Sequence, residues 1–282
     1  MLDYHEQMIQ KNNDNMAIDI VGVAALDDNY IWIITQGTST VVIDPSESAP
    51  VIEWLKTHQR NLTAILITHT HHDHIGGVQG LLDAYPNCFV YANRSAQLPF
   101  SHHPLSIKDT LNIDALNITI IDLSGHTPDQ IGYYLPSAQA LFCGDALFAG
   151  GCGRLFNGGT AAQMTATLAR ISVLPQQTKI YCAHEYTLAN LRFAQISEPD
   201  NQATAERLDQ VIRLRRQGLP TLPSLLSEEL ATNPFLRTES TKLHQAIDTH
   251  SGIKSETPIE RFAHLRAWKD QLDSTGILEV SP

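Results

Sequence analysis

The stretch Ile67-Thr68-His69-Thr70-His71-His72-Asp73-His74-Ile75-Gly76-Gly77 places four candidate metal ligands within six residues. Imidazole and carboxylate groups are the ligands that borderline divalent metals such as zinc prefer. Side chains two positions apart point the same way in an extended chain, so His69 and His71 can share one ion. Asp73 and His74 lie past the bend and point elsewhere. The stretch therefore indicates a metal site, and its spacing suggests two ions.

Four residues cannot fill two coordination shells, so further ligands must come from distant parts of the chain. Three polar residues stand at the ends of strand-like apolar runs, and the quoted motif itself follows such a run at 64–67. Sites in α/β sheets are built at the carboxyl ends of strands. We therefore expect these three residues to complete the site. They are His126 after 116–123, Asp145 after 141–143, and His184 after 178–183.

The order His-x-His-x-Asp-His, followed by His, Asp and His, resembles the metallo-β-lactamase superfamily. Five further elements are similar to one branch of it, the glyoxalase II or hydroxyacylglutathione hydrolase family. The similarity runs from about Met16 to the C-terminus. The five elements are Cys143-Gly144-Asp145, Gly151-Cys152-Gly153-Arg154, His184-Glu185-Tyr186-Thr187, Asn233-Pro234-Phe235 and the Leu-Arg-x-x-Lys-Asp pattern at 265–270.

This resemblance implies an α+β fold: an αββα metallo-β-lactamase sandwich of two mixed sheets, followed by a smaller all-helical C-terminal domain. We expect the catalytic domain over residues 16–184 and a helical substrate-binding domain over 185–282. The residue pattern agrees, because short β-rich runs dominate up to about Ala183 and helical spacing follows. Residues 1–15 are polar and lack the apolar core of a signal peptide, so we expect a disordered extension there.

The resemblance also implies how the ligands divide between the ions. His69, His71 and His126 would hold one ion. Asp73, His74 and His184 would hold the other. Asp145 would bridge them, which suits a carboxylate because it has two oxygens and can serve two cations. The expected cofactors are two divalent ions, with zinc first and iron or manganese as alternatives that accept the same ligands.

A thioester suits such a site. Coordination lowers the pKa of water from 15.7 towards roughly 7, so a hydroxide shared by the two ions is the expected nucleophile, with Asp73 and Asp145 as the catalytic carboxylates. The leaving thiol has a pKa near 8.5 and departs without a protonating acid. The resemblance implies hydrolysis of S-(2-hydroxyacyl)glutathione, with S-D-lactoylglutathione giving glutathione and D-lactate in the second step of methylglyoxal detoxification.

Glutathione contacts fall by resemblance on Arg154, Tyr186, Arg266 and Lys269. Glutathione carries two carboxylates, which cationic side chains can bind. This chain departs from some family members at two positions, with Arg154 in place of lysine and Phe156 in place of tyrosine. Arg266 and Lys269 also fit a solvated helix face, and Tyr186 also fits core packing.

Other functions remain open at this point. A persulfide dioxygenase with a single iron, or a lactonase or β-lactamase, would use the same fold, but the helical tail favours the glutathione hydrolase. A non-catalytic metal-binding module would need a broken ligand position, and none is broken. Asp44 follows the strand-like run 40–43 and precedes a proline, so it either orients a ligand histidine or forms a turn.

Composition narrows the setting. The chain has 19 basic and 30 acidic residues and a net charge of −11, which argues against a nucleic-acid partner. No apolar run reaches the 18 residues of a membrane span, and the four cysteines show no CxxC pairing. We therefore expect buried free thiols, a cytoplasmic enzyme and no membrane partner. No long apolar helix face stands out as an interface, so a monomer is expected.

Overall fold

The computed structural model describes residues 17–279, so the predicted extension at 1–15 lies outside the described residues. The contacts divide the chain into two compact units. One unit runs to Ile120 and includes Leu135–Ala138, and the other comprises Ile121–Tyr134 and the chain from Gln139 onward.

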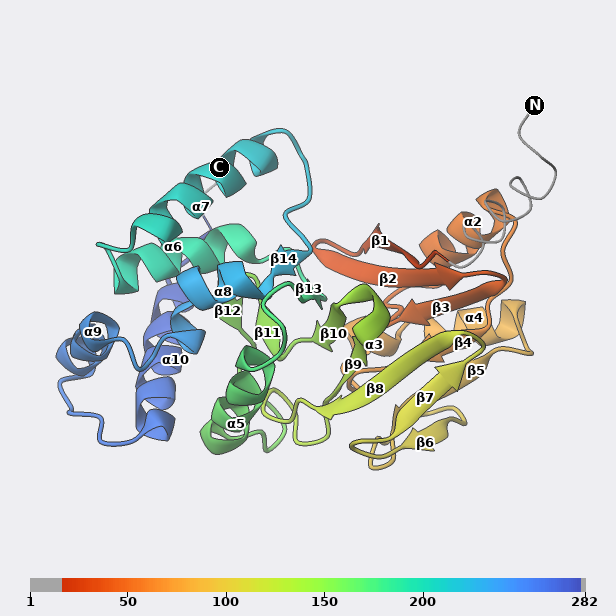
Figure 1. The fold of residues 1–282 in the computed structure, drawn as a ribbon, viewed down its shortest axis with the longest axis horizontal. Helices are drawn as coiled ribbons and strands as arrows, with labels where there is room; N and C mark the ends of the chain where they lie inside the picture. Colours follow the sequence, from red (N-terminus) through yellow and green to blue (C-terminus); the bar gives the residue numbers. More distant parts are fainter. Residues whose placement is uncertain (1–16, 280–282) are drawn as a thin grey trace, which may run out of the picture. The chain divides into compact units, whose positions relative to one another are not determined.

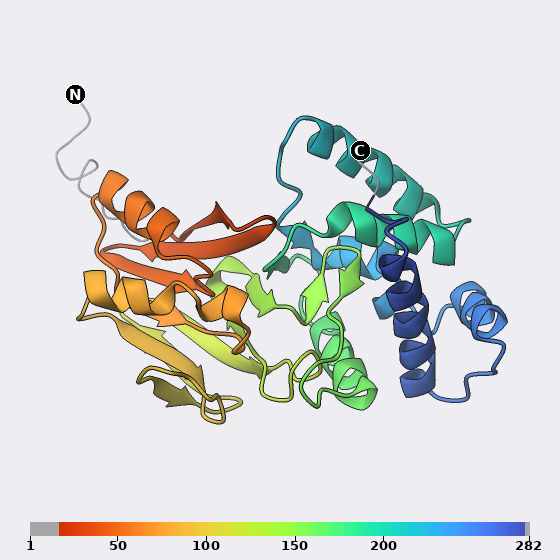
Figure 2. The same ribbon diagram turned by 180° about the vertical axis from the view of Figure 1, so that it is seen from behind.

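The first unit is built on a six-stranded sheet with the order β1-β2-β3-β4-β5-β6 (Figure 1). Neighbours are antiparallel as far as β3, and the pairs from β3 to β6 are parallel. Three helices, α2, α3 and α4, belong to the described part of this unit. Helices α2 and α4 run along one face of the sheet (Figure 2). The elements are β1 Asp19–Ala25, β2 Asn29–Gln36, β3 Ser39–Ile43, α2 Ala49–Thr57, β4 Ala64–Leu66, α3 His72–Ile75, α4 Val78–Ala84, β5 Phe89–Asn93 and β6 His103–Leu105.

One apolar core joins this sheet to its helices. Ile33 and Val42 from the strands pack in a common cluster with Val51 and Leu55 of α2 and with Leu81 of α4. Val51 and Leu55 are four residues apart, so they lie on the same face of α2, as expected for a helix that covers a sheet. Fully burying each such side chain contributes about 1.5–3 kcal/mol to folding. This core fixes the position from which β3 and β4 present their carboxyl ends.

The second sheet has the order β14-β13-β10-β9-β8-β7. Within it β10 and β13 are parallel, with Gly144 opposite Cys182, so the residues after both strands emerge at the same edge. β14 follows His184 in the chain yet pairs antiparallel with β13, which the expectation of an all-helical tail did not include. The strands are β7 Thr110–Ile113, β8 Leu116–Asp122, β9 Ile131–Leu135, β10 Ala140–Gly144, β13 Lys179–Cys182 and β14 Ser224–Leu225.

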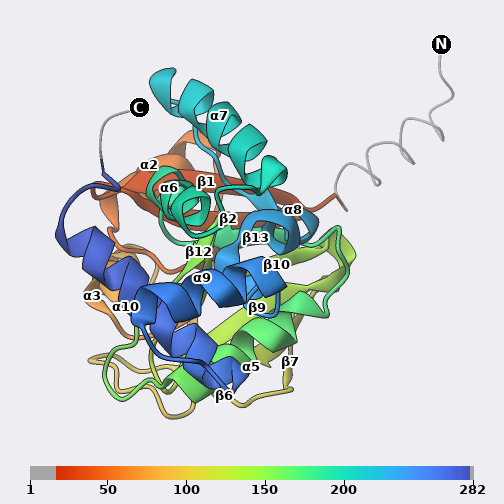
Figure 3. The ribbon, with the colours of Figure 1, turned by 90° about the vertical axis from the view of Figure 1, so that its left-hand side faces the viewer.

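Helices dominate the remainder of the second unit (Figure 3). α6 packs on α7, and α10 packs on both α9 and α5. Capping boxes begin α5 at Thr160 and α10 at Thr257, and the side chain of Asn201 caps α7. The elements are η1 Pro136–Ala138 of the first unit, and β11 Leu147–Phe148, β12 Gly151–Cys152, α5 Ala161–Ser172, α6 Thr187–Ser197, α7 Gln202–Arg216, α8 Leu226–Thr232, η2 Pro234–Leu236, α9 Thr241–Ser251 and α10 Pro258–Ser274 of the second.

The four strands expected to deliver ligands are confirmed as β4, β8, β10 and β13. The helical spacing expected after about Ala183 is confirmed by the long helices α7, α9 and α10. Over residues 17–279, no helix is long and apolar enough to cross a membrane.

Candidate metal centre

The histidine-rich motif of the first unit begins at the carboxyl end of β4. The chain is still extended at His71, with φ −63° and ψ 149°, and α3 begins at the next residue. In this extended stretch His69 and His71 point to the same side, and Nε2 of His69 lies 3.0 Å from Nδ1 of His71. His69 is buried and His71 is half-buried. The predicted bend between the first two and the last two ligands is therefore confirmed.

Asp73 and His74 lie on α3, past this bend. Nε2 of His74 is 3.5 Å from a carboxylate oxygen of Asp73. Nδ1 of His74 is 3.0 Å from Oδ2 of Asp44, and because a carboxylate only accepts, this contact puts the ring proton on Nδ1 and the lone pair on Nε2. The amide and hydroxyl of Thr68 donate to the same carboxylate at 2.8 and 2.6 Å. Asp44, buried and 30 residues from His74 in sequence, thus orients a ligand histidine.

Asp44→Asn should weaken metal binding by about 10–100-fold, because outer partners of ligand histidines typically contribute that much. An amide group can turn its donor towards Nδ1 and so disfavour the tautomer that exposes the Nε2 lone pair. Competition between the protein and a chelating dye measures the effect. Asp114→Asn is the matched control: Asp114 also has a positive φ and accepts a hydrogen bond from Ser39, but none to a histidine is recorded for it. Equal losses in both variants would contradict the assignment.

The second unit places a buried carboxylate between two buried histidines. Oδ2 of Asp145 lies 3.6 Å from Nε2 of His126, and Oδ1 lies 3.4 Å from Nε2 of His184. Each oxygen therefore faces a different imidazole, which is the arrangement that a carboxylate shared by two cations requires. The parallel pairing of β10 and β13 produces it by bringing both strand ends to one edge.

His126 is held by the main chain of a residue that we predicted for another role. Its Nδ1 lies 2.7 Å from the carbonyl oxygen of Arg154, and because a carbonyl only accepts, Nδ1 carries the proton. The lone pair is then on Nε2, the atom that faces Asp145. On the other side, the ring of His184 stacks on that of Tyr186 with centroids 4.7 Å apart and planes 7° apart.

Arg266 and Lys269 are buried, so the alternative of a solvated helix face is wrong. Arg266 donates to the carbonyl of Cys152 at 3.0 Å and lies 5.1 Å from the ring centre of Phe235. Lys269 lies 2.9 and 3.1 Å from the two oxygens of Asp273. Burial, followed by the charge of Arg266, lowers the pKa of the Lys269 ammonium. The two cations form a fixed charged cluster on α10.

Two acidic residues complete this cluster: Asp270, which the 265–270 pattern contains but to which no role was assigned, and Asp273. Asp270 lies 2.9 Å from a guanidinium nitrogen of Arg266, and Arg154 reaches both Asp270 and Asp273 at 3.4 and 3.3 Å. The i,i+4 spacing of both acids from the two cations was the local signal that could have revealed them. The cluster therefore contains three cations and two carboxylates.

Tyr186 and Phe156 have partly exposed rings. Tyr186 is 38 % exposed, so the core-packing alternative is wrong for it, and its ring meets Phe148 edge-on at 5.2 Å. Phe156 is 45 % exposed and lies edge-on to His126 at 5.4 Å. An apolar ring at this position can contact a ligand but offers no hydroxyl.

Family models match nearly the whole described chain. The metallo-β-lactamase superfamily model covers residues 25–184, and the model of the hydroxyacylglutathione hydrolase C-terminus covers 185–272. Two proteins named hydroxyacylglutathione hydrolase, from Aeromonas hydrophila and Pseudomonas aeruginosa, are 45 % and 46 % identical, over 89 % and 90 % of this chain and 98 % and 99 % of their own lengths. The chain belongs to the hydroxyacylglutathione hydrolase family. The predicted fold, a metallo-β-lactamase domain followed by a helical C-terminal domain, is thereby confirmed.

A solved structure with the same fold contains metal. The protein described as TTHA1623 in a di-iron-bound form is 26 % identical, with a TM-score of 0.52, over 59 % of this chain and 91 % of that one. The first unit of this chain carries four of the predicted ligands and the second carries three, and all seven are His or Asp residues that could hold a metal ion. The donor set, five imidazoles and two carboxylates, fits divalent ions of the zinc and iron type. Fold and donors together indicate a dinuclear metal site.

All four cysteines are free and buried, as predicted. Burial raises the pKa of the Cys152 thiol to about 11 and that of Cys182 to about 12. A thiol that remains protonated is a poor nucleophile. We expect a thiol-specific disulfide reagent at neutral pH to label the folded protein slowly and to count four thiols only after denaturation. Rapid labelling of any of them in the native protein would contradict this.

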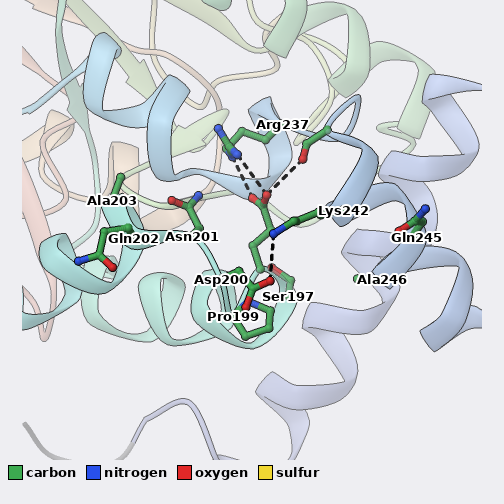
Figure 4. Close-up of a pocket in the computed structure, with 12 residues that line it drawn as sticks. Ser197, Pro199, Asp200, Asn201, Gln202, Ala203, Arg237, Lys242, Gln245 and Ala246 are labelled. Atoms are coloured by element: carbon green, nitrogen blue, oxygen red, sulfur yellow. Dashed lines mark hydrogen bonds and ion pairs between the residues drawn. The ribbon is translucent and has the colours of Figure 1, made fainter.

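A pocket of about 650 Å³ lies elsewhere in the second unit (Figure 4). Its cations are neutralised by acids: Arg237 bonds the carboxylate of Glu198 at 2.9 and 3.1 Å, and Lys242 pairs with Asp200 at 3.0 Å. The predicted ligands and glutathione contacts do not line it. This pocket therefore does not coincide with the candidate metal centre.

Proposed function

We propose that this chain hydrolyses S-(2-hydroxyacyl)glutathione to glutathione and a 2-hydroxy acid, with S-D-lactoylglutathione as its substrate in methylglyoxal detoxification. The observation that carries the proposal is the identity of 45–46 % over nearly the full length of relatives that bear the hydroxyacylglutathione hydrolase name. The C-terminal model of that family also matches the tail, which distinguishes this branch from the wider superfamily.

The seven ligands divide, in this proposal, as the family resemblance implies. His69, His71 and His126 would hold one ion, and Asp73, His74 and His184 would hold the other. Asp145 would be a ligand of both. The position of Asp145 between Nε2 atoms of two histidines supports the bridging role. Zinc is the proposed metal because imidazole and carboxylate are its usual ligands, with iron and manganese as competitors.

Divalent ions bound here supply Lewis acidity, which lowers the pKa of water towards roughly 7 and polarises the thioester carbonyl. The protein contributes orientation. Asp44 holds the tautomer of His74, and the carbonyl of Arg154 holds that of His126. Asp73 and Asp145 would supply two negative charges, which offset part of the positive charge of two divalent ions. The leaving glutathione thiol, with a pKa near 8.5, departs without an acid from the protein.

The charged cluster on α10 is the proposed glutathione site. Arg154, Arg266 and Lys269 outnumber Asp270 and Asp273, so one positive charge is in excess when all are ionised. That excess suits a substrate carboxylate, although the whole chain carries a net charge of −11. Tyr186, with its partly exposed ring, is proposed as a further contact.

Composition and the cysteines support a proposal for the partners and the compartment of the protein. The excess of acidic residues favours an enzyme that binds no nucleic acid. Four buried free thiols favour the reducing cytoplasm. We propose a monomer, and a boundary between the catalytic and substrate-binding domains after His184, where the two family models also meet.

The deciding experiment is hydrolysis of S-D-lactoylglutathione by the purified, metal-loaded protein, followed by the thioester absorbance, with elemental analysis of the same sample. We expect turnover with about two metal ions per chain. A sample that binds two ions and leaves the thioester intact would reject the proposed substrate. Oxygen consumption with glutathione persulfide would then identify the alternative, a dioxygenase.

A further inference from the structure

A buried ion pair lies in the helical part of the second unit, outside the proposed metal and glutathione sites. Glu229 of α8 is 0 % exposed, and its Oε1 accepts a hydrogen bond of 2.5 Å from Arg207 of α7. Burial alone would lower the pKa of the Arg207 guanidinium, but the adjacent Glu229 carboxylate raises it overall. An ion pair removed from water needs a compensating reason, because desolvation can exceed the attraction.

The contacts of this pair lead to one turn of the main chain, residues 148–151, which we call the β11–β12 turn. Oε2 of Glu229 accepts from the amide of Gly150 at 2.8 Å. The side-chain amide of Asn233, which is also 0 % exposed, reaches Oε2 of Glu229 at 3.0 Å. The same amide lies 3.2 and 2.9 Å from the carbonyls of Phe148 and Gly151.

Asn190 of α6 binds the carbonyl of Ala149 at 3.1 Å. Main-chain groups of the turn are thus held by buried side chains from α6, from α8 and from Asn233, the residue after α8. Gly150 has φ +71°, a conformation that favours glycine, so the turn is specified by its sequence as well as by its partners.

The β11–β12 turn is continuous with the proposed metal ligands. Asp145 lies two residues before β11, and Arg154, whose carbonyl fixes the tautomer of His126, lies two residues after β12. Between them Gly153 passes so close that a Cβ there would lie 2.1 Å from the carbonyl oxygen of Asp145 and 2.9 Å from Nδ1 of His126. A shift of the turn would therefore be transmitted to both ligands.

We propose that Glu229, Arg207 and Asn233 are positioning residues for the metal centre. By holding the β11–β12 turn, they set the relative placement of the Asp145 carboxylate and the His126 ring. The helical C-terminal part then has a second role beside substrate binding, because it fixes the positions of two proposed metal ligands. This inference rests on the proposed metal-dependent function, and its test does not depend on the substrate.

The test replaces the ion pair with apolar side chains of similar size, Arg207→Met with Glu229→Leu, which leaves no buried charge unpaired. We expect the affinity for Co²⁺ to fall by about 10–100-fold, the size typical of outer partners of metal ligands. The absorption spectrum of the cobalt-loaded protein should change, because the ligand geometry changes. Turnover of S-D-lactoylglutathione should fall mainly in kcat.

The matched control is Glu198→Leu with Arg237→Met, drawn in Figure 4. This pair is also a Glu–Arg contact in the second unit, and Glu198 is buried, but its further side-chain bonds join Glu198 to Ser240 and Arg237 to the carbonyl of Leu230 rather than to the turn. We expect the control to retain the cobalt affinity and spectrum of the unchanged protein within about twofold, whatever its thermal stability. A turn variant that retains them as well would overturn the proposal.

Gly150→Ala provides a second route if the double variant fails to fold. The new Cβ would lie 3.0 Å from Cδ2 of Leu191 at a strained φ, and it leaves every charge in place. A folded Gly150→Ala protein with weakened cobalt binding would support the proposal, and unaltered cobalt binding would overturn it. If the unchanged protein binds two ions but does not hydrolyse the thioester, the proposed function fails while the cobalt comparison still decides this inference.

Discussion

An Asp145→Ala protein should lose at least one of its two metal ions and most of its thioesterase activity. Asp145 faces Nε2 of His126 with one oxygen and Nε2 of His184 with the other, so its removal takes a ligand from both proposed ions. Metal stabilisation of the reaction is worth several kcal/mol, and a loss of about 4 kcal/mol lowers kcat about a thousandfold.

Elemental analysis after exhaustive dialysis and initial rates with S-D-lactoylglutathione measure both effects. Asp209→Ala removes an exposed carboxylate from α7 and should leave both quantities unchanged. Asp145→Asn refines the result, because it retains one acceptor oxygen and should hold one ion better than the other. Two ions per chain in the Asp145→Ala protein would reject the bridging role outright.

The second large effect is expected in KM when the cations of α10 are removed together. Arg266→Met with Lys269→Met takes away two of the three positive charges of the cluster and leaves Asp273, which is only 13 % exposed, with Arg154 as its remaining cationic partner. A hydrogen bond to a charged group contributes about 1.5–3 kcal/mol, so KM should rise by about 100-fold or more. The metal count should not change, since neither residue is a proposed ligand.

Lys242→Met is the control, because this lysine also pairs with an aspartate but lies at the pocket of Figure 4. Thermal unfolding of both proteins separates a loss of stability from a loss of binding. A fall in kcat with KM unchanged would argue that the cluster acts on the reacting atoms rather than on the glutathione moiety.

The candidate metal ligands could be named from the sequence because their signals are local. Two ligands lie two apart before a bend and two lie beyond it, and each remaining ligand follows an apolar run that ends in a turn. Strand periodicity places such residues at one edge of a sheet without further information. The helical tail was equally visible in its spacing and capping residues, Asn201 and Thr257 among them.

The partners of these residues were less visible. The sequence allowed two interpretations of Asp44, a partner of a ligand histidine or a turn former. Its 3.0 Å contact with His74, 30 residues away, identifies it as a histidine partner. The burial of Glu229 has no local signal in the sequence, because a Glu-Glu pair in a helix usually lies on a solvated face. Burial turns it into the centre of a hydrogen-bond network.

Family resemblance in the sequence determined the expected fold, and local spacing determined the candidate ligand set and the helical tail, because periodicity and ligand chemistry act over a few residues. The tertiary structure alone decided which charges are buried and what neutralises them. Arg266 donates to the carbonyl of Cys152, 114 residues away, and Glu229 accepts from Gly150, 79 residues away. Such contacts depend on how whole elements pack, since the cost of burying a charge is set by partners that no local pattern encodes.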